Sequence, residues 1–529
     1  MNIMEKSLQY IIEKWADSPE GRLQKAHLDL ESAPELNRIL SSCADPGAAL
    51  EMVFDLCSGN LRKKEGTFYT PVDVAGKMFE NALDIWQKSH PSYSELCNIK
   101  VLDPACGVGG FLFAALDVLL EKHLQFNPRK DRKTIIGEII NNNIYGIDCN
   151  KDALQVLKSK LKVVSSEYVD NKHFAHCDAL DNDDAGKCFA SGEKFDIVIG
   201  NPPYVSYGLR NAGKLDKEKL QILRKRFADS AEYKITVYAL FMEFAIRSTA
   251  ENGVHTFIVP DSFLCGQYFG LIRNFMLKNC SLEQFFLIRK KLFNAVPGNL
   301  VIYTAVKKIP TDDQQVKITQ IDNNEEFTLS KVDNLILQRR FAENHRQRFR
   351  LFFDPAIDRK ICSMESASCG KLADVVTLSS GLVAKSGKSS IVSREKLSAS
   401  WLPGITSGSC VRANEPVIWQ NEYINSDPSV IKSGLKKSIY NTGKILIRQT
   451  GDRIIAAVDR SGLLVLNNLH VAVAKTENLD LERLTEYLNS DEMLLYYQAV
   501  TMESNRPMAQ IDLETLRELP LPEKFEKPS

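Results

Sequence analysis

The spacing of apolar residues divides the chain into three parts. Residues 10–15 and 48–61 place apolar side chains at helical spacing, which predicts a helical extension over residues 1–60. From Leu61 to about Pro310, short apolar runs alternate with helical stretches, as in a βα-repeat sheet. The pattern there predicts strands over residues 99–102, 144–147, 173–176, 195–199, 254–259, 284–288 and 301–306, and helices over 110–123, 152–164 and 237–249.

Residues 311–529 have a different pattern of apolar and polar residues. Polar loops and Ser/Gly-rich stretches separate short β-type runs at residues 444–448, 454–458 and 463–466, and a helix is predicted over 481–500. We therefore predict an α/β domain over residues 61–310, with helices on both faces of its sheet, and an α+β domain over residues 311–529. The boundary is expected between Pro310 and about Phe349 and is set at residue 310.

The amino-acid composition limits the kinds of protein that this chain can be. The 529 residues, 44% of them hydrophobic, suffice for two to four domains. We find no signal peptide and no run of about 18 apolar residues, so we expect a cytoplasmic protein without a membrane span. The 12 cysteines are scattered without CxxC or Cys/His ligand spacing, which favours reduced thiols and no metal site.

The charges balance, with 67 Lys and Arg residues against 67 Asp and Glu residues. This argues against a nucleic-acid binder that neutralises phosphates over its whole surface, but local patches can still do so. One basic stretch covers residues 338–350 and includes Arg339 and Arg340, and a second covers residues 289–291. Each is either a phosphate-contact surface or an ordinary solvated face.

The most informative residues are Asn201, Pro202, Pro203 and Tyr204, which follow the predicted strand 195–199. Neither proline nitrogen can donate a hydrogen bond, so helix and sheet both stop here. The Asn201 side-chain oxygen and the Pro202 carbonyl can accept both hydrogens of a planar exocyclic amine, and the Tyr204 ring can stack on the group that carries it. The alternative is a proline turn that closes a strand, with the tyrosine as a surface anchor.

Three earlier strand ends also carry polar or glycine-rich sequences. Residues 103–111 form a glycine-rich turn that lets a ligand approach the backbone. Asp148 follows the second strand, where an acid can bind both ribose hydroxyls of a nucleoside, although Asp148 or Asn150 could instead cap a helix. Asp178 follows the third strand and could accept from an adenine amino group. Ligands of open α/β sheets bind at this edge.

With these motifs the chain resembles the γ-class adenine-N6 DNA methyltransferases of the TaqI type. The resemblance is specific over about residues 60–310 and looser after about residue 350. It assigns roles residue by residue. Residues 65–71 match the segment that closes over the methionine part of the cofactor, and Phe269 matches the aromatic that holds the flipped base. The cofactor-binding residues it implies are Thr67, Tyr69, Thr70, Asp103, Ala105, Gly107, Gly109, Asp148, Asp178, Ala179 and Asn201.

The resemblance implies a Rossmann-like S-adenosylmethionine-dependent methyltransferase sheet with a C-terminal target-recognition domain. It implies methyl transfer from S-adenosylmethionine to an adenine that is flipped out of double-stranded DNA. Asn201 and Pro202 would accept from the adenine amine, while Tyr204 and Phe269 would stack on the base. We expect a monomeric, nucleoid-associated modification enzyme, either paired with a separately encoded restriction endonuclease or acting as an orphan or defence methyltransferase.

Base recognition is expected in the C-terminal domain. Arg448, Gln449 and Arg453 lie between two β-type runs, where Arg and Gln could contact guanine or adenine edges. They could equally be ordinary polar residues of a turn.

Other functions fit parts of the sequence. A methyltransferase with the same four-residue motif could act on a protein glutamine or on RNA, but residues 311–529 would then be unexplained. A modification subunit would need a separate specificity chain, and a fused restriction enzyme would need a nuclease motif that we do not find. An inactive DNA-binding relative is disfavoured by the intact Gly107, Asp148, Asn201 and Tyr204.

Overall fold

The computed structural model describes residues 70–165, 171–189, 192–207, 216–233, 235–289, 298–322, 327–434, 440, 442–504 and 509–527. The predicted helical extension over residues 1–60, and Thr67 and Tyr69, lie outside these ranges. The chain forms two compact units, the first ending at Phe349 and the second beginning at Arg350. No helix among the described residues is both long and apolar enough to cross a bilayer.

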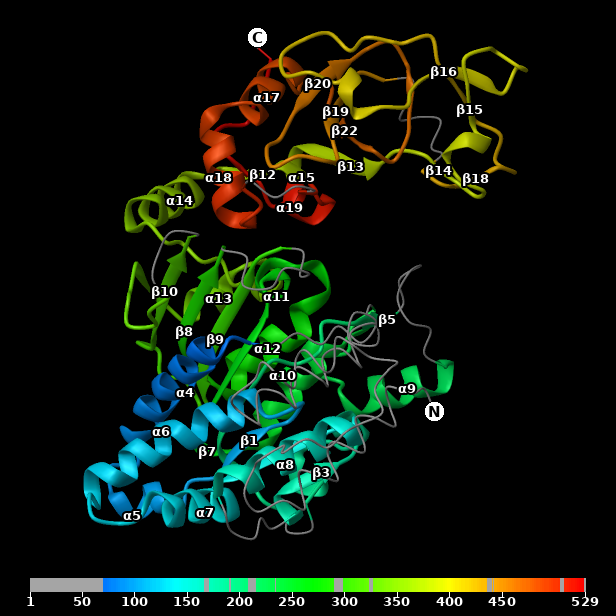
Figure 1. Cartoon of the computed structure of the whole chain (residues 1–529). Coiled ribbons are helices and arrows are strands. Elements are labelled where there is room, and N and C mark those ends of the chain that lie inside the picture. The colour runs from blue at the N-terminus through cyan, green and yellow to red at the C-terminus, as the bar shows by residue number, and fades with distance from the viewer. Residues whose placement is uncertain are drawn as a thin grey trace. The chain divides into compact units, whose positions relative to one another are not determined.

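The first unit is built on a nine-stranded sheet in the order β11-β10-β8-β9-β7-β4-β1-β2-β3 (Figure 1). The strands are β1 (Val101–Asp103), β2 (Ile144–Asp148), β3 (Phe174–His176), β4 (Phe195–Gly200), β7 (Thr249–Pro260), β8 (Ser281–Ile288), β9 (Leu300–Val306), β10 (Gln315–Ile321) and β11 (Asn334–Leu337). Neighbours from β3 to β7 are parallel, and β9 is antiparallel to both β7 and β8. All seven predicted strands are confirmed.

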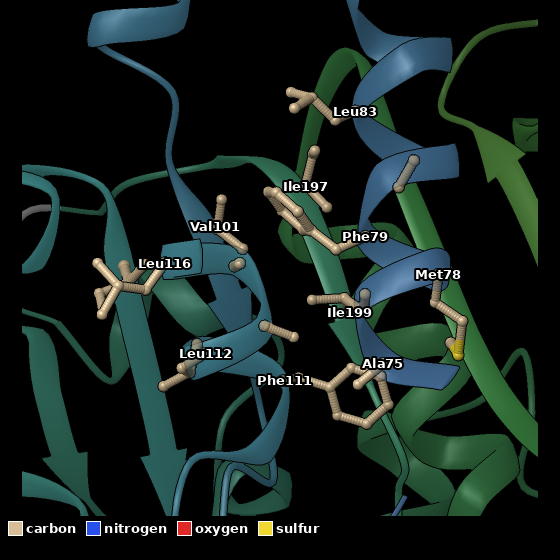
Figure 2. Close-up of a cluster of buried hydrophobic side chains, with 14 of the residues drawn as sticks. Ala75, Met78, Phe79, Leu83, Val101, Phe111, Leu112, Leu116, Ile197 and Ile199 are labelled. Atoms are coloured by element: carbon tan, nitrogen blue, oxygen red, sulfur yellow. The ribbon is translucent and has the colours of Figure 1, made fainter. Parts of the chain in front are cut away.

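Helices cover both faces of this sheet, as predicted. Helices α4 (Val72–Gln87), α6 (Gly110–Phe126), α7 (Arg132–Asn142) and α8 (Lys151–Ser165) share one apolar core with the sheet. Figure 2 shows Phe79 of α4 and Leu112 of α6 in this core with Val101, Ile197 and Ile199 of the sheet. The alternate side chains of β4 and β7 point to the other face, where α10 (Val237–Ser248) and α12 (Gly270–Asn279) pack.

The strand order places a topological switch point between β1 and β4. From β1 the chain proceeds outward through β2 and β3 on one side, and β4 and β7 continue on the other. Loops that leave neighbouring strands in opposite directions at such a point create a crevice beyond the carboxyl ends of the strands. The fold therefore brings the motif after β1 next to the motif after β4.

The boundary set at residue 310 is corrected by the structure. Strand β10 pairs in parallel with β8, and β11 pairs antiparallel with β10, so residues 315–337 extend the first sheet. Apolar and polar residues alternate from Gln315 to Thr319, and Val316, Ile318 and Ile321 are buried together with Thr319. The polar residues 311–315 resemble a linker between domains, so the sequence pattern placed the domain boundary before this strand. The first unit continues to Phe349.

The second unit is α+β, as predicted. Its sheets are β13-β22-β19-β20, β15-β17-β16-β21, β14-β18 and β12-β23. The strands are β12 (Gly370–Lys371), β13 (Val376–Ser380), β14 (Val383–Ala384), β15 (Val392–Ser393), β16 (Trp401–Ile405), β17 (Tyr423–Asn425), β18 (Ile431–Ser433), β19 (Lys444–Arg448), β20 (Ala456–Asp459), β21 (Leu464–Val465), β22 (Leu469–Ala474) and β23 (Pro520–Leu521). The helices are α14 (Pro355–Ala367), α15 (Leu372–Val375), α17 (Leu481–Leu488), α18 (Asp491–Thr501) and α19 (Leu513–Arg517).

The helix predicted over residues 481–500 is two helices, α17 and α18. The side chain of Asn489 accepts from Ala456 N and donates to Ala456 O, both at 2.9 Å. Ser490 then caps α18, with its hydroxyl accepting from Met493 N at 3.1 Å. The buried Asn489 amide thus completes the backbone hydrogen bonds at the start of β20, and the helix is interrupted where it does so. The apolar periodicity of residues 481–500 does not reveal this contact.

Candidate functional site

The turn after β1 is fixed to β2 by its backbone. Cys106 N donates to Ile147 O at 3.0 Å, and Gly109 N donates to Cys106 O at 2.8 Å. Gly107 and Gly109 have positive φ angles of 54° and 93°, which favour glycine. A Cβ on Gly109 would also collide with the Leu157 side chain. The turn is therefore held close to the sheet and leads directly into the N-terminus of α6, whose first N–H groups lack partners within the helix.

Asp148 joins this turn to the end of β2. Its Oδ2 accepts from Gly107 N at 2.8 Å, and its Oδ1 accepts from Asn150 N at 2.7 Å. The cap of α8 is Asn150, whose Oδ1 accepts from Asp152 N at 3.0 Å and from Ala153 N at 3.2 Å. The two interpretations of the sequence are thus separated: Asn150 caps the helix, and Asp148 is a half-buried carboxylate that bridges two loops at the edge of the sheet.

Asp103 lies at the contact between the ends of β1 and β4. It is buried, and its Oδ1 accepts from Ala105 N at 3.0 Å. A Cβ on Gly200 would lie 2.8 Å from the same oxygen, so glycine at the end of β4 leaves room for the carboxyl group. Burial, together with the nearby charge of Asp148, raises the pKa of Asp103 to about 8. The Asp103 carboxyl is therefore mainly protonated at neutral pH.

The raised pKa of Asp103 makes stability depend on pH. The folded protein keeps a proton that the unfolded chain releases near pH 4, so this group favours folding at low pH and loses that effect as the pH rises toward about 8. We expect Asp103→Asn, which cannot ionise, to flatten the fall in melting temperature between about pH 5 and pH 8. Thermal unfolding of both proteins across this range is the measurement, and parallel profiles would contradict the prediction.

Asn201 contacts the segment that precedes helix α4. Its Nδ2 donates to Thr70 Oγ1 at 3.2 Å, although the two residues are 131 positions apart. Thr70 stands immediately before Pro71, whose carbonyl accepts from Ala75 N in the first turn of α4. The two polar atoms of an amide point to opposite sides of its carbon. The contact therefore directs the Asn201 oxygen away from Thr70.

Tyr204 and Phe269 meet a third aromatic residue. The Tyr204 hydroxyl donates to Ile258 O of β7 at 3.1 Å, and burial raises the pKa of Tyr204 well above its usual value. Its ring meets Tyr238 edge to face with 6.2 Å between ring centroids, and Phe269 stacks on Tyr238 at 5.6 Å. The structure thus gathers the two predicted aromatic walls into one cluster around Tyr238.

Tyr238 is a site residue that the sequence pattern did not single out. It is the second residue of α10, a helix that is apolar on nearly every side, and the pattern predicts only a buried helix there. Its hydroxyl is 2.8 Å from Ser262 Oγ. A buried tyrosine hydroxyl usually needs a hydrogen-bond partner. A tyrosine in an otherwise apolar helix was therefore a feature of the sequence that could have pointed to this residue. Only the tertiary fold shows which rings it joins.

Asp178 lies at the next strand end. Its Oδ1 accepts from Leu180 N at 3.1 Å, and Lys219 Nζ is 3.5 Å from its Oδ2. Cys177 N donates to Asp148 O at 3.2 Å, which joins the ends of β3 and β2. The neighbouring Ala179 is buried. The predicted residues from Asp103 to Asp178 therefore lie along one edge of the sheet, beside Asn201 and the buried Pro202.

The basic stretch 338–350 is not one surface. Arg339 is exposed and Arg340 half-buried on α13 (Arg339–Glu343), but Arg348 and Arg350 are buried. Arg350 Nη1 lies 2.6 Å from Glu365 Oε1. For Arg348 and Arg350 both interpretations of the sequence, phosphate contact and solvated face, are wrong. Of the second basic stretch, residues 290 and 291 lie outside the described ranges.

The candidate base-contacting residues of the second unit stand at the end of β19 and in the loop that follows it. Arg448 Nε donates to Val411 O at 2.8 Å, which fixes its side chain against the protein. Gln449 and Arg453 are half-buried, and the Gln449 backbone bonds to Asn468 and Ile511. Within the described ranges, no group of three or more His, Cys, Asp or Glu side chains is arranged to hold a metal ion.

Two family models match the chain. The Eco57I restriction-modification methylase model matches residues 142–293, which include Asp148, Asp178, Asn201 and Phe269. The TaqI-like C-terminal specificity domain model matches residues 406–521. The chain thus combines a restriction-modification methylase domain with a TaqI-like specificity domain. This confirms the resemblance to TaqI-type methyltransferases, and we call the two compact units the methylase domain and the specificity domain.

Curated relatives of this chain are restriction-modification methyltransferases. The chain is 26% identical over 253 residues to the Type II methyltransferase M.BstVI of Geobacillus stearothermophilus, a match that covers 46% of this chain and 42% of the relative. It is 24% identical over 315 residues to the Type II methyltransferase M.VspI of Vibrio sp. (strain 343), covering 59% and 63%. The chain thus spans less than two thirds of the length of either relative.

A solved structure has the same fold over nearly the whole chain. It is a nuclease-deletion mutant of the Type ISP restriction-modification enzyme LlaGI in complex with a DNA substrate mimic. The similarity has a TM-score of 0.59 at 13% identity and covers 96% of this chain and 58% of that one. At this identity the similarity establishes the fold.

Proposed function

We propose that this protein is a site-specific DNA methyltransferase that uses S-adenosylmethionine to methylate the N6 amino group of adenine. The observation that carries the proposal is the contact between the ends of β1 and β4. There the buried Asp103 lies against Gly200, one residue before Asn201. A nucleoside-type cofactor held by the first motif would then lie beside an amine held by the second.

The residues at the first three strand ends fit S-adenosylmethionine. Gly107 and Gly109 keep side chains out of the turn, so a ligand can approach the backbone there. We assign binding of the ribose hydroxyls to Asp148 and binding of the adenine amino group to Asp178. Thr70 and Asp103 would bind the methionine part. The site would be completed by Thr67, Tyr69, Ala105 and Ala179. When bound, this cofactor supplies an electrophilic methyl group.

Asn201 and Pro202 would orient the target amine. Their oxygens would accept its two hydrogens, which concentrates lone-pair density on the nitrogen and aims it along the line of attack. Positioning of this kind is a large catalytic term, and no strong base is needed first because the proton can leave after the nitrogen becomes positive. The Tyr204 cluster would stack on the base and replace the stacking lost on flipping, about 1–3 kcal/mol per contact.

DNA is the proposed polymer because of the second domain. A TaqI-like specificity domain accompanies the methylase domain, and the LlaGI structure holds a DNA substrate mimic. We assign base or phosphate contacts to Arg339, Arg340, Arg448, Gln449 and Arg453. The protein would act in the cytoplasm as a monomer, and a separately encoded restriction endonuclease is its proposed partner.

The proposal is tested with purified protein, labelled S-adenosylmethionine and unmethylated bacterial DNA. We expect label on DNA, recovered after hydrolysis as N6-methyladenine. Sequencing the modified bases in a host that expresses the chain would give the recognition site. Label found only on protein or RNA would refute the DNA assignment and leave amine methylation standing. Label on cytosine would refute the choice of adenine.

Thr70→Val tests how Asn201 is oriented. The variant keeps the shape of Thr70 but loses the acceptor for Asn201 Nδ2, so the amide can rotate. We expect kcat to fall about tenfold, as for one lost hydrogen bond that orients a reacting group, with little change in the KM for DNA. Thr70→Ser, which keeps the hydroxyl, should recover most of the rate. Equal loss in both variants would contradict this role.

A further inference from the structure

Two tyrosines from different segments meet on the surface of the methylase domain. The Tyr233 and Tyr268 rings have centroids 6.2 Å apart and planes inclined by 34°. Tyr233 is 82% exposed, Tyr268 is half-buried, and the nearby Leu271 is 41% exposed. We call these three residues the tyrosine patch. Single exposed apolar side chains are common, but a contiguous exposed group often marks an interaction site.

The patch is held in place by hydrogen bonds rather than by burial. Glu232 Oε1 accepts from Leu271 N at 2.7 Å, which ties the residue before Tyr233 to the start of α12. Arg224 Nη2 donates to Tyr233 O at 3.3 Å. The backbone that carries Tyr233 is therefore fixed next to Tyr268 although its ring is exposed. Such an arrangement presents a flat face at a low conformational cost on binding.

The patch begins one residue from the aromatic cluster of the site. Tyr268 directly precedes Phe269, and consecutive Cα atoms are about 3.8 Å apart. The Phe269 ring stacks on Tyr238, which also meets Tyr204 of the catalytic motif. Phe269 points into the protein and is 8% exposed, whereas Tyr233 faces solvent. Two consecutive residues of one short segment thus belong to the aromatic cluster and to the tyrosine patch.

Cationic side chains flank the patch. Arg224 and Arg346 are exposed, and Arg346 Nη1 donates to Gln267 O at 3.1 Å, immediately before Tyr268. The Glu232 carboxylate, which lies beside the patch, accepts a hydrogen bond from Leu271 N. Flat aromatic faces beside guanidinium groups are the combination that binds unstacked bases and their phosphates.

We propose that the tyrosine patch is a second stacking platform, which binds a DNA base left without a neighbour when the target adenine leaves the helix. The inference rests on the proposed function. Flipping exposes the faces of the adjacent bases and leaves the opposite base unpaired. The Tyr233 ring supplies a replacement face, and Tyr268 supports it from the protein side. This platform lies outside the cluster that holds the target base itself.

Tyr233→Ala, and separately Tyr268→Ala, test the platform in the full chain. We expect the KM for sheared, unmethylated bacterial DNA to rise about tenfold for Tyr233→Ala. The KM for S-adenosylmethionine should stay within about twofold of wild type, and so should kcat. Tyr233→Phe keeps the ring and should restore the wild-type KM. Tyr268→Ala should raise the KM less, because its ring supports the platform instead of forming it.

Phe126→Ala is the matched control. Phe126 is 57% exposed and stacks on Tyr93 with centroids 4.5 Å apart, so it is also an exposed aromatic in a ring pair. It ends α6, which starts at the carboxyl edge of the sheet and runs about 25 Å away from it over 17 residues. We expect no change in the KM for DNA.

The outcomes separate this inference from the proposed function. If the wild-type protein methylates DNA and Tyr233→Ala has the wild-type KM, the platform is refuted and the proposed function stands. If Tyr233→Phe is as impaired as Tyr233→Ala, stacking is refuted as the cause. If the wild-type protein transfers no methyl group to DNA, the proposed function fails and the platform fails with it.

Discussion

Replacing Asn201 with alanine is expected to lower methyl transfer by about a thousandfold, in line with the loss of a group that stabilises a developing charge. The variant loses the oxygen that would accept from the target amine, and it loses the contact of Nδ2 with Thr70. Asn201 follows Gly200 at the end of a strand that is buried from Ile197 to Gly200, so truncation there leaves the sheet intact. Single-turnover kinetics with labelled cofactor and DNA measure the effect.

A second variant, at Asp148, separates an effect on catalysis from an effect on cofactor binding. Asp148→Ala removes the carboxylate that accepts from Gly107 N and Asn150 N, so we expect it to weaken S-adenosylmethionine binding by about tenfold or more. Asn201→Ala should bind the cofactor with close to wild-type affinity by calorimetry. If Asn201→Ala loses cofactor affinity as strongly as Asp148→Ala, then Asn201 acts mainly in cofactor binding and its assigned role is wrong.

Lys444→Met is expected to destabilise the specificity domain by about 3–5 kcal/mol, the usual cost of leaving one partner of a buried ion pair. Lys444 Nζ is 2.6 Å from Asp459 Oδ2, and the two side chains are 0% and 2% exposed on the paired strands β19 and β20. Burial raises the pKa of Asp459, but bonds from Lys444 and Ser461 lower it more, and the net pKa lies below the usual value. Without Lys444 the carboxylate is buried without its cation.

The double variant Lys444→Met with Asp459→Leu is the control. It replaces both charges with apolar groups, and such replacements are often close to neutral because no charge is left buried. Urea unfolding of the full chain should therefore show a lower midpoint for Lys444→Met and a midpoint near wild type for the double variant. If the single and double variants are destabilised equally, packing of the lysine stem, not the ion pair, stabilises this sheet.

The sequence by itself determined the strands of the first sheet and the candidate site residues that follow them. Each motif directly follows an apolar run, and strands buried on both faces are recognisable from composition alone. The apolar pattern therefore predicts Asp103, Asp148, Asp178 and Asn201 at strand ends, and all four strands are present. The break at Asn489 and the continuation of the sheet after residue 310 were missed. Both depend on partners that are distant in the chain.

Only the tertiary structure decided which groups meet. It showed that Asn150, not Asp148, caps α8, that Asp103 is buried against Gly200, and that Tyr238 joins the two predicted aromatic walls. It also showed that Arg348 and Arg350, which belong to a basic stretch of the sequence, are buried. These results share one physical reason. Periodicity reports whether a side chain faces a core, but burial, pKa and ring contacts depend on residues brought together from distant strands.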